Sequence, residues 1–274
     1  MVALHGCTQT AGDFAAGTRF DSVAERVGAY VIYPEQTVRA NGNRCWNWFL
    51  HAHQARERGE PAAIVSLVND VVARHPIDPK RIYVAGLSAG GAMAAILAEQ
   101  APDVFAAAGI MAGVPLHASR NVDTAFKTMR GSVAIHEAVT LLGGHRPKGV
   151  SYDRLRVTIW TGLDDRTVNP RNAVALVQQF RFLAGIDEVP PETETRKDAV
   201  IERWRDGRGR VRVEAWRLPK IGHAWSGGSF RGSHTDPNGP SASDAMMAFF
   251  LDESTLPAQA GPAPAEKPLS QTGL

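Results

Sequence analysis

This 274-residue chain has few cysteines, no long apolar run and almost no excess of one charge. It carries 30 Lys and Arg against 28 Asp and Glu. The formal net charge is therefore only +2, and no basic run is sustained. The most basic stretch, residues 203–212, is interrupted by Asp206, and we interpret it as a solvated turn between two strands. These features predict no nucleic-acid partner. No apolar run reaches the length that spans a bilayer, so we expect no membrane insertion.

The chain has only two cysteines, Cys7 and Cys45, and neither has a CxxC partner. This spacing gives no support to a zinc site or a thioredoxin-like motif, and we predict no metal ion. On spacing alone, a disulfide and a pair of buried free thiols fit equally well. A disulfide closing this loop would contribute about 4 kcal/mol in the chain-entropy model.

The beginning of the chain shows no basic region followed by an apolar run and a cleavage site, so no secretory leader is recognisable. Residues 2–6 instead have the pattern of the last half of a buried strand. Because an exposed strand edge needs a partner, we expect the natural protein to extend upstream of Met1.

The composition is that of a globular domain with a sizeable core, at 44% hydrophobic and 21% charged residues. Strand-like and helix-like segments alternate, which predicts a mostly parallel sheet with helices on both faces. The expected strands are residues 2–4, 29–33, 81–85, 105–111, 155–161 and 211–218. The expected helices are residues 19–27, 60–75, 88–99, 172–183 and 241–250.

The expected domain organisation is one α/β domain over residues 1–252, followed by a disordered tail rich in Pro and Ala over residues 253–274. Residues 113–153 show no sustained period. We expect them to form either an excursion over the active site or a connection built from short helices.

Ser88 is the candidate nucleophile. It lies in the sequence GLSAG at residues 86–90, directly after an apolar strand-like run and before an Ala-rich helical segment. This strand–turn–helix context is what the nucleophile elbow requires, because the serine must adopt a strained backbone that lifts its hydroxyl clear of the sheet. Gly86 and Gly90 remove side chains that would collide in so tight a turn. The alternative is a Gly-rich turn with an incidental serine.

A serine needs a base, and the base needs an orienting acid, in the chain order Ser, Asp or Glu, His. The strand at residues 155–161 runs into two adjacent acids, Asp164 and Asp165, of which we prefer Asp165. Either residue could instead serve only as a turn or helix-cap aspartate. The strand at residues 211–218 leads to His223 in a Gly-flanked loop, with His234 as the fallback base.

The tetrahedral intermediate needs two hydrogen-bond donors. The first candidate is the backbone N–H of Ala89, and the second is the N–H of Cys7, in the loop after the first strand. This loop could also be a strand-ending turn with no ligand role.

Six stretches together resemble the polyhydroxybutyrate (PHB) depolymerase family of esterases, which also contains feruloyl and acetylxylan esterases. They lie at residues 4–9, 33–36, 45–49, 86–91, 162–168 and 222–228. As a set they are far more specific than GxSxG alone. The resemblance implies an α/β-hydrolase fold, although the strands that related domains carry before the first loop are missing here.

The resemblance also implies a catalytic triad of Ser88, Asp165 and His223. It selects Asp165 over Asp164 through an Asp-x-x-Val pattern, which Asp165 and Val168 meet here.

The same resemblance implies an oxyanion hole formed by Cys7 and Ala89. Members of the family are generally secreted, which favours a disulfide between Cys7 and Cys45 and an extracellular location. Trp46, Trp48 and Trp225 flank the expected cleft, where they could support a substrate, or they could simply pack in the core.

The expected activity is hydrolysis of carboxylic esters through an acyl-enzyme, with no cofactor and no obligatory protein partner. The first expected substrate is a poly(3-hydroxyalkanoate) or a short-chain ester, and feruloyl or acetylxylan esters are the alternative. One rival hypothesis is a non-catalytic binding module on a hydrolase scaffold, because the same fold can be kept after its catalytic function is lost. Another is an acyltransferase with the same triad.

Overall fold

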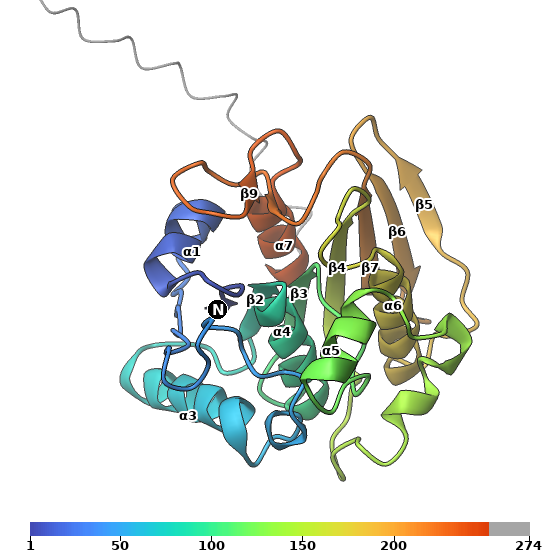
Figure 1. The fold of residues 1–274 in the computed structure, drawn as a ribbon, viewed down its shortest axis with the longest axis horizontal. Coiled ribbons are helices and arrows are strands. Elements are labelled where there is room, and N and C mark those ends of the chain that lie inside the picture. Colours follow the sequence, from blue (N-terminus) through green and yellow to red (C-terminus); the bar gives the residue numbers. More distant parts are fainter. Residues whose placement is uncertain (252–274) are drawn as a thin grey trace, which may run out of the picture.

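The computed structural model describes residues 1–251, so the tail expected at residues 253–274 lies outside the described residues. Within this part of the chain, a seven-stranded sheet has the order β1-β2-β3-β4-β7-β6-β5 (Figure 1). Five strands run parallel: β1 (Val2–Leu4), β2 (Tyr83–Leu87), β3 (Ala107–Met111), β4 (Arg156–Gly162) and β7 (Val211–Leu218). An antiparallel extension, β6 (Val200–Arg205) and β5 (Glu192–Thr195), completes the sheet.

Helices cover both faces of this sheet. The helices are α1 (Ala11–Thr18), α2 (Phe20–Val27), α3 (Gly59–Arg74), α4 (Ala89–Gln100), α5 (Val122–Met129), α6 (Arg171–Leu183) and α7 (Ala242–Leu251). Three 3₁₀ turns are η1 (His51–His53), η2 (Ile135–Glu137) and η3 (Thr140–Leu142), and β8 (Trp225–Ser226) pairs with β9 (Thr235–Asp236) in a separate ribbon.

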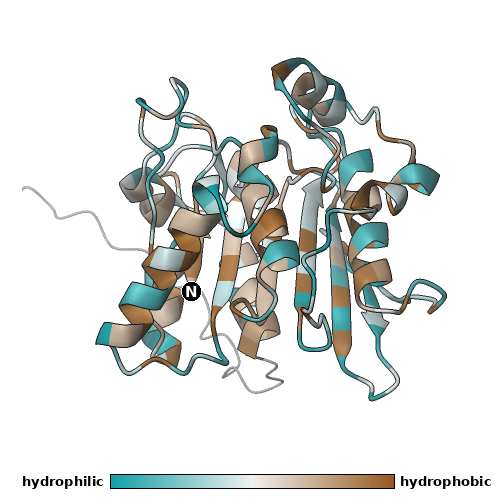
Figure 2. Ribbon diagram, turned by 90° about the horizontal axis from the view of Figure 1, so that it is seen from below, coloured by the Kyte–Doolittle hydropathy of each residue, from teal (hydrophilic) through white to brown (hydrophobic). Residues whose placement is uncertain are grey.

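Two apolar layers hold the helices on the sheet. One layer takes its residues from α3, α4 and α6, and the other from α1, α2 and α7. Successive residues of β2 face opposite layers, because side chains alternate along a strand: Val84 enters the first layer, and Tyr83 and Ala85 enter the second. Figure 2 shows the apolar residues gathered on the strands and on the helices that pack against them. The predicted α/β architecture with helices on both faces is confirmed.

Helix α4 is buried along all twelve of its residues. Its sequence is rich in Ala and Gly, which lets its backbone approach β2 and β3 closely. The helix begins directly after Ser88, so its positive N-terminal end lies at the carboxyl edge of the parallel strands.

One predicted strand is wrong. Residues 29–33 make only a single parallel bridge, between Val2 and Ile32. Two hydrogen bonds of 2.9 Å flank it, from the N–H of Ala3 to the carbonyl of Ile32 and from the N–H of Ile32 to the carbonyl of Met1. The chain then turns inward, and the N–H of Gln36 donates to the buried ring of His5 at 3.0 Å. Because of this turn, the segment cannot continue alongside β1.

Residues 113–153 form the short-helix connection that was one of the two alternatives, with α5, η2 and η3. The interpretation of residues 203–212 as a turn is only partly right. Arg203 and Arg205 belong to β6, and the turn itself lies between β6 and β7.

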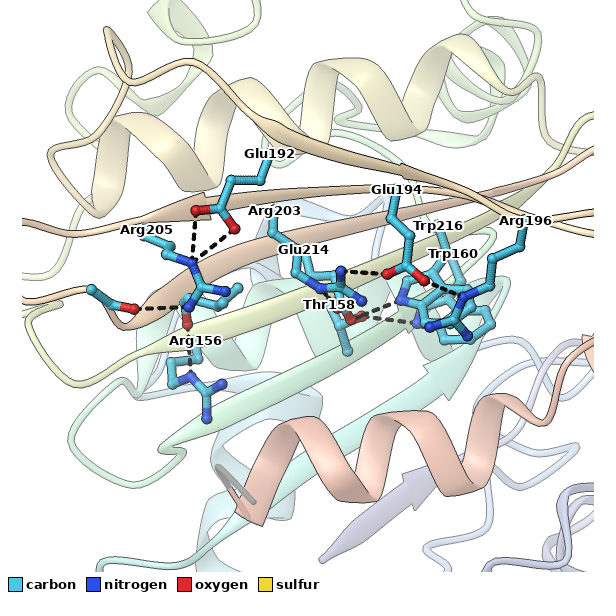
Figure 3. Close-up of polar contacts among 12 residues, drawn as sticks. Arg156, Thr158, Trp160, Glu192, Glu194, Arg196, Arg203, Arg205, Glu214 and Trp216 are labelled. Atoms are coloured by element: carbon cyan, nitrogen blue, oxygen red, sulfur yellow. Dashed lines mark hydrogen bonds and ion pairs between the residues drawn. The ribbon is translucent and has the colours of Figure 1, made fainter. Parts of the chain in front are cut away.

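The antiparallel extension carries a ladder of ion pairs on one face (Figure 3). Arg205 pairs with Glu192 at 2.9 Å, and Arg203 pairs with Glu194 at 2.8 Å. Arg203 also reaches the buried Glu214 of β7 at 2.8 Å. The ladder therefore links three neighbouring strands through side chains as well as through backbone bonds.

In residues 1–251 no helix has both the length and the apolar character needed to cross a membrane.

Candidate active site

Ser88 stands at the turn between β2 and α4. Its backbone has φ 58° and ψ −118°, a strained conformation for a residue other than glycine. Its N–H donates to the carbonyl of Met111 at the end of β3, at 2.9 Å, which holds the turn against the sheet. A Cβ on Gly90 would lie 2.1 Å from the carbonyl oxygen of Leu4, and one on Gly86 would lie 2.3 Å from that of Gly90. Both positions therefore require glycine, and the turn has the geometry of a nucleophile elbow.

The acid and the base come from the loops after β4 and β7, and they meet directly. His223 Nδ1 and Asp165 Oδ2 are 2.7 Å apart, and the Asp165 side chain is fully buried. The other carboxylate oxygen, Oδ1, accepts the N–H groups of Thr167 and Val168, each at 2.8 Å. These bonds fix the carboxylate, which in turn fixes the imidazole with Nδ1 as the donor.

Asp164, the alternative acid, is exposed. Its backbone N–H donates to the carbonyl of Ile221 at 3.1 Å, so it helps to tie the acid loop to the loop that carries His223. The ring of His234, the fallback base, lies 6.5 Å from the ring of His223. The hydrogen bond to the buried carboxylate thus belongs to the pair Asp165 and His223.

The loop after β1 runs beside Ser88. Leu4 pairs with Gly86, and a Cβ placed on Gly6 would lie 3.6 Å from Ser88 Cβ. Within this loop His5 is buried, and its Nδ1 lies 2.8 Å from the carbonyl of Gly6. Burial lowers the pKa of His5, which keeps its ring neutral, with one nitrogen donating and the other accepting.

Cys7 and Cys45 form a disulfide, so the bridge and not the pair of free thiols is present. The bridge ties the loop after β1 to residues 41–47. Two hydrogen bonds support the same contact: Thr8 N–H to the carbonyl of Asn43 at 2.7 Å, and Trp46 Nε1–H to the carbonyl of His5 at 3.1 Å. Ala89 follows Ser88 at the buried start of α4, and Cys7 follows Gly6, the residue of this loop that lies beside Ser88.

The three tryptophans expected along the cleft are buried. Trp46, Trp48 and Trp225 are 4%, 7% and 1% exposed, respectively. Trp225 packs its ring edge-on against Phe14 and Phe20, and its Nε1 donates to Ser243. The structure therefore supports the alternative given for these residues, that they pack in the core, because large apolar rings gain most by leaving water.

Two parts of the site were not recognised from the sequence. Gln9 lies in residues 4–9, one of the six stretches that carry the family resemblance. Its partner Ser233 is 224 residues away, and no spacing rule connects the two. The second part is Asp13, which accepts hydrogen bonds from Ser233. Within residues 1–251, no three His, Cys, Asp or Glu side chains are grouped so that they could hold a metal ion.

Several known proteins are similar to this chain. Poly(3-hydroxyalkanoate) depolymerase C of Paucimonas lemoignei is 34% identical over 256 residues, which cover 92% of this chain and 59% of that protein. The poly(3-hydroxybutyrate) depolymerase of Ralstonia pickettii is 30% identical over 84% of this chain and 48% of its own length. Feruloyl esterase B of Neurospora crassa is 31% identical over 68% of this chain and 65% of its own length. The chain thus spans only part of the length of these relatives.

Among solved structures, an acetyl xylan esterase from Aspergillus awamori superposes with a TM-score of 0.76. The match covers 91% of this chain and 87% of that one at 21% identity, which shows a shared fold. The α/β-hydrolase fold expected from the sequence is confirmed. A family model described as "Esterase PHB depolymerase" matches residues 1–199, which include Ser88 and Asp165 and end before His223. With most of its length matched by that model, the chain belongs to the esterase PHB depolymerase family.

Proposed function

We propose that this chain is a serine esterase that hydrolyses carboxylic esters through an acyl-enzyme on Ser88. The observation that carries the proposal is the 2.7 Å contact between His223 Nδ1 and the buried Asp165. Because Asp165 occupies Nδ1, Nε2 is the ring nitrogen that exchanges a proton with Ser88. The strained turn of Ser88 at the same edge of the sheet supports this assignment.

In the first half of the reaction, Ser88 Oγ attacks the ester carbonyl carbon while His223 Nε2 takes the hydroxyl proton. The carbonyl oxygen becomes an oxyanion, which the N–H groups of Cys7 and Ala89 stabilise. Asp165 stabilises the imidazolium that forms and remains ionised. The intermediate then collapses: the C–O bond to the alcohol breaks, and the alcohol leaves with the proton from Nε2.

In the second half, water attacks the acyl group on Ser88 and gives a proton to His223 Nε2. The second tetrahedral intermediate forms against the same two donors. Its collapse breaks the bond between the acyl carbon and Oγ, releases the carboxylic acid and returns the proton to Ser88.

The first substrate class that we propose is a poly(3-hydroxyalkanoate) or a short-chain ester, because two of the relatives that share 30% or more of their residues are depolymerases of such polymers. Feruloyl or acetylxylan esters are the second candidate class, and the 31% identity to a feruloyl esterase supports the first of these two. We also propose that the protein acts outside the cell, because disulfides such as Cys7–Cys45 persist in oxidising compartments.

Hydrolysis of p-nitrophenyl butyrate by the wild type and by Ser88→Ala tests the reaction. We expect the substitution to lower kcat by about 10⁴-fold or more, because loss of a triad nucleophile leaves only the oxyanion hole and binding. Equal background rates for the two proteins would contradict the proposal and favour a non-catalytic role.

A second assay addresses the substrate. The wild type is compared on films of poly(3-hydroxybutyrate), on methyl ferulate and on acetylated xylan, with Ser88→Ala as the blank for each. An added alcohol acceptor shows whether the acyl group passes to water or to an alcohol, which separates a hydrolase from an acyltransferase.

A further inference from the structure

Two loops from opposite ends of the chain must keep a fixed relation in the proposed mechanism. We call them the oxyanion loop (residues 5–9) and the base loop (residues 222–236). The buried side chain of Gln9 joins them. Its Oε1 accepts the N–H of Gly6 at 2.8 Å, and its Nε2 donates to the carbonyl of Ser233 at 3.0 Å and to Asp13 Oδ2 at 2.9 Å. An amide has one acceptor and two donor hydrogens, so these partners fix which way the Gln9 side chain faces.

Asp13 completes the link from the first turn of α1. Its carboxylate accepts the backbone N–H of Ser233 at 2.9 Å and the Ser233 hydroxyl at 2.6 Å. Burial raises the pKa of Asp13, but the hydrogen bonds from Ser233 and Gln9 outweigh burial and lower this pKa below its ordinary value. The carboxylate therefore stays ionised and acts as an acceptor for both partners.

Backbone hydrogen bonds within the base loop connect Ser233 to the segment that follows His223. The strand pair β8–β9 closes the loop on itself, since Trp225 pairs with Thr235, and the N–H of Trp225 donates to the carbonyl of His234 at 2.7 Å. Ser233 therefore lies one residue before a point that is hydrogen-bonded back to the segment following His223. A second anchor, Ser229 N–H to the carbonyl of Gly17 at 2.8 Å, holds the same loop on α1.

The oxyanion loop transmits the anchor toward Cys7. Gln9 holds the N–H of Gly6, and the ring of His5 lies 2.8 Å from its carbonyl. That carbonyl and the N–H of Cys7 belong to one planar peptide group. Fixing Gly6 at both ends therefore fixes the direction in which the Cys7 N–H points. A Cβ on Gly6 would lie 3.1 Å from Gln9 Oε1 and 3.6 Å from Ser88 Cβ, so Gln9 and Ser88 flank the same residue.

We propose that Gln9 is a positioning residue of the esterase. By bonding Gly6 in the oxyanion loop and, through Ser233 and Asp13, the base loop, it fixes the position of the Cys7 N–H relative to His223. This inference rests on the proposed function. It concerns how accurately the donor is aimed, and it gives Gln9 no contact with the substrate. A displacement of about 1 Å in such a group can cost 10²-fold in rate.

The main test is Gln9→Leu, which keeps the approximate volume of the side chain and removes all its hydrogen bonds. We expect kcat for p-nitrophenyl butyrate to fall by about 10- to 100-fold, with KM changed by less than about twofold, because the clamp acts on a donor used chiefly in the transition state. Inhibition by butylboronic acid, whose adduct with Ser88 places an oxygen where the oxyanion forms, should weaken by a similar factor.

Gln179→Leu is the matched control. Gln179 is an equally buried amide, and it bonds the backbone of Leu116 and Ala138, outside both loops. We expect it to lower Tm and to leave kcat within about twofold of the wild type. If Gln9→Leu does not fold, Gln9→Glu replaces it, since the carboxylate still accepts the Gly6 N–H but repels Asp13. Its kcat should fall at least about fivefold.

A double-mutant cycle tests the coupling between the loops. Asp13→Asn is measured alone and together with Gln9→Leu. If Gln9 acts through Asp13 and Ser233, the double variant should lose much less in kcat than the product of the two single losses.

The outcomes separate this inference from the proposed function. A wild type that depends on Ser88, together with an unchanged kcat in Gln9→Leu or the same loss of kcat in Gln179→Leu, would overturn the positioning role alone. Fully multiplicative losses in the cycle would overturn the clamp between the loops. A wild type with no esterase activity would instead contradict the proposed function.

Discussion

The parallel strands and the antiparallel extension of this sheet use different side chains and have different tasks. Strands β2 and β3 are buried at every residue, whereas β5 is mostly exposed and carries the sequence ETET. The loops at the carboxyl edge of the parallel strands hold the candidate residues Ser88, Asp165 and His223, and the extension holds none of them. Parallel strands covered on both faces must all end at one edge, which is where side chains for chemistry can converge.

The extension instead joins its strands to one another and to β7 through charged side chains that pair across neighbouring strands (Figure 3). Substitutions at the carboxyl edge should therefore change catalysis and leave stability nearly intact. Substitutions in the extension should do the reverse.

The largest effect is expected for Asp165→Asn. The N–H groups of Thr167 and Val168 require an oxygen at Oδ1, so the new amide must present its NH₂ to His223. Nδ1 then becomes an acceptor, the proton moves to Nε2, and His223 cannot take the proton of Ser88. We expect kcat to fall about 10⁴-fold, measured with p-nitrophenyl butyrate at pH 7–8.

Asp164→Asn is the control for this prediction, because Asp164 is the exposed neighbour and contributes a backbone bond. Its kcat should stay within about twofold of the wild type. A large loss in this variant, with little loss in Asp165→Asn, would reverse the assignment of the acid.

Removal of the disulfide should affect both catalysis and stability. Cys7 belongs to the oxyanion loop, and the bridge also restrains the unfolded chain. For Cys7→Ala/Cys45→Ala, we expect about 4 kcal/mol less stability, since the bridge closes a loop with a sequence separation of 38. Urea unfolding of the oxidised wild type and of the double variant measures this difference. Equal midpoints would show that the bridge contributes nothing to stability.

Glu214→Ala tests the ion pairs that join the extension to the parallel strand β7. Glu214 is buried and accepts hydrogen bonds from Arg203, Thr158 and Trp216, at 2.8, 3.0 and 2.7 Å. Its loss should cost about 3 kcal/mol, near the lower end for a broken buried pair because Arg203 keeps Glu194 as a partner. Tm should fall by about 6–12 °C, while kcat well below Tm should remain within about twofold of the wild type.

If Glu214→Ala lowered kcat by a factor that corresponds to the same free energy as its loss of stability, this result would contradict the division of tasks between the two regions. Thr193→Ala, on the exposed edge strand β5, is the control and should leave both quantities nearly unchanged.

The same division explains what could be predicted from the sequence. Apolar runs predicted β2, β3 and β4, and the alternation of apolar and polar residues predicted β7. The turn at Ser88 could be recognised because its strand and its helix both adjoin it in the sequence. Strand β5 has no apolar residue, so its place in the sheet depends on pairing with β6, which no local pattern shows.

The site divides in the same way. The order of Ser88, Asp165 and His223 along the chain, supported by the resemblance, predicted a histidine–aspartate pair that the structure brings within 2.7 Å. The link from Gln9 to Ser233 depends on tertiary packing across 224 residues. The burial of the tryptophans was open in the sequence, because an aromatic ring gains from a core and from a cleft alike.

The smallest effect is expected for Glu194→Gln in the ion-pair ladder. Hydrogen bonds from Arg196 and Arg203 lower the pKa of Glu194 below its ordinary value of 4.5. A lowered pKa in the folded state means that the stabilisation is present above the ordinary pKa and is lost as the pH falls through the folded one. Because Glu194 is 41% exposed, solvent screening limits the loss at pH 7 to about 0.5 kcal/mol. Urea unfolding of both proteins should show this difference at pH 7, less of it at high salt, and none once the wild-type carboxylate is itself protonated. A loss above about 2 kcal/mol, or one that persists in acid, would mean that the exposed ion pairs of Glu194 contribute as much to stability as the buried Glu214 does.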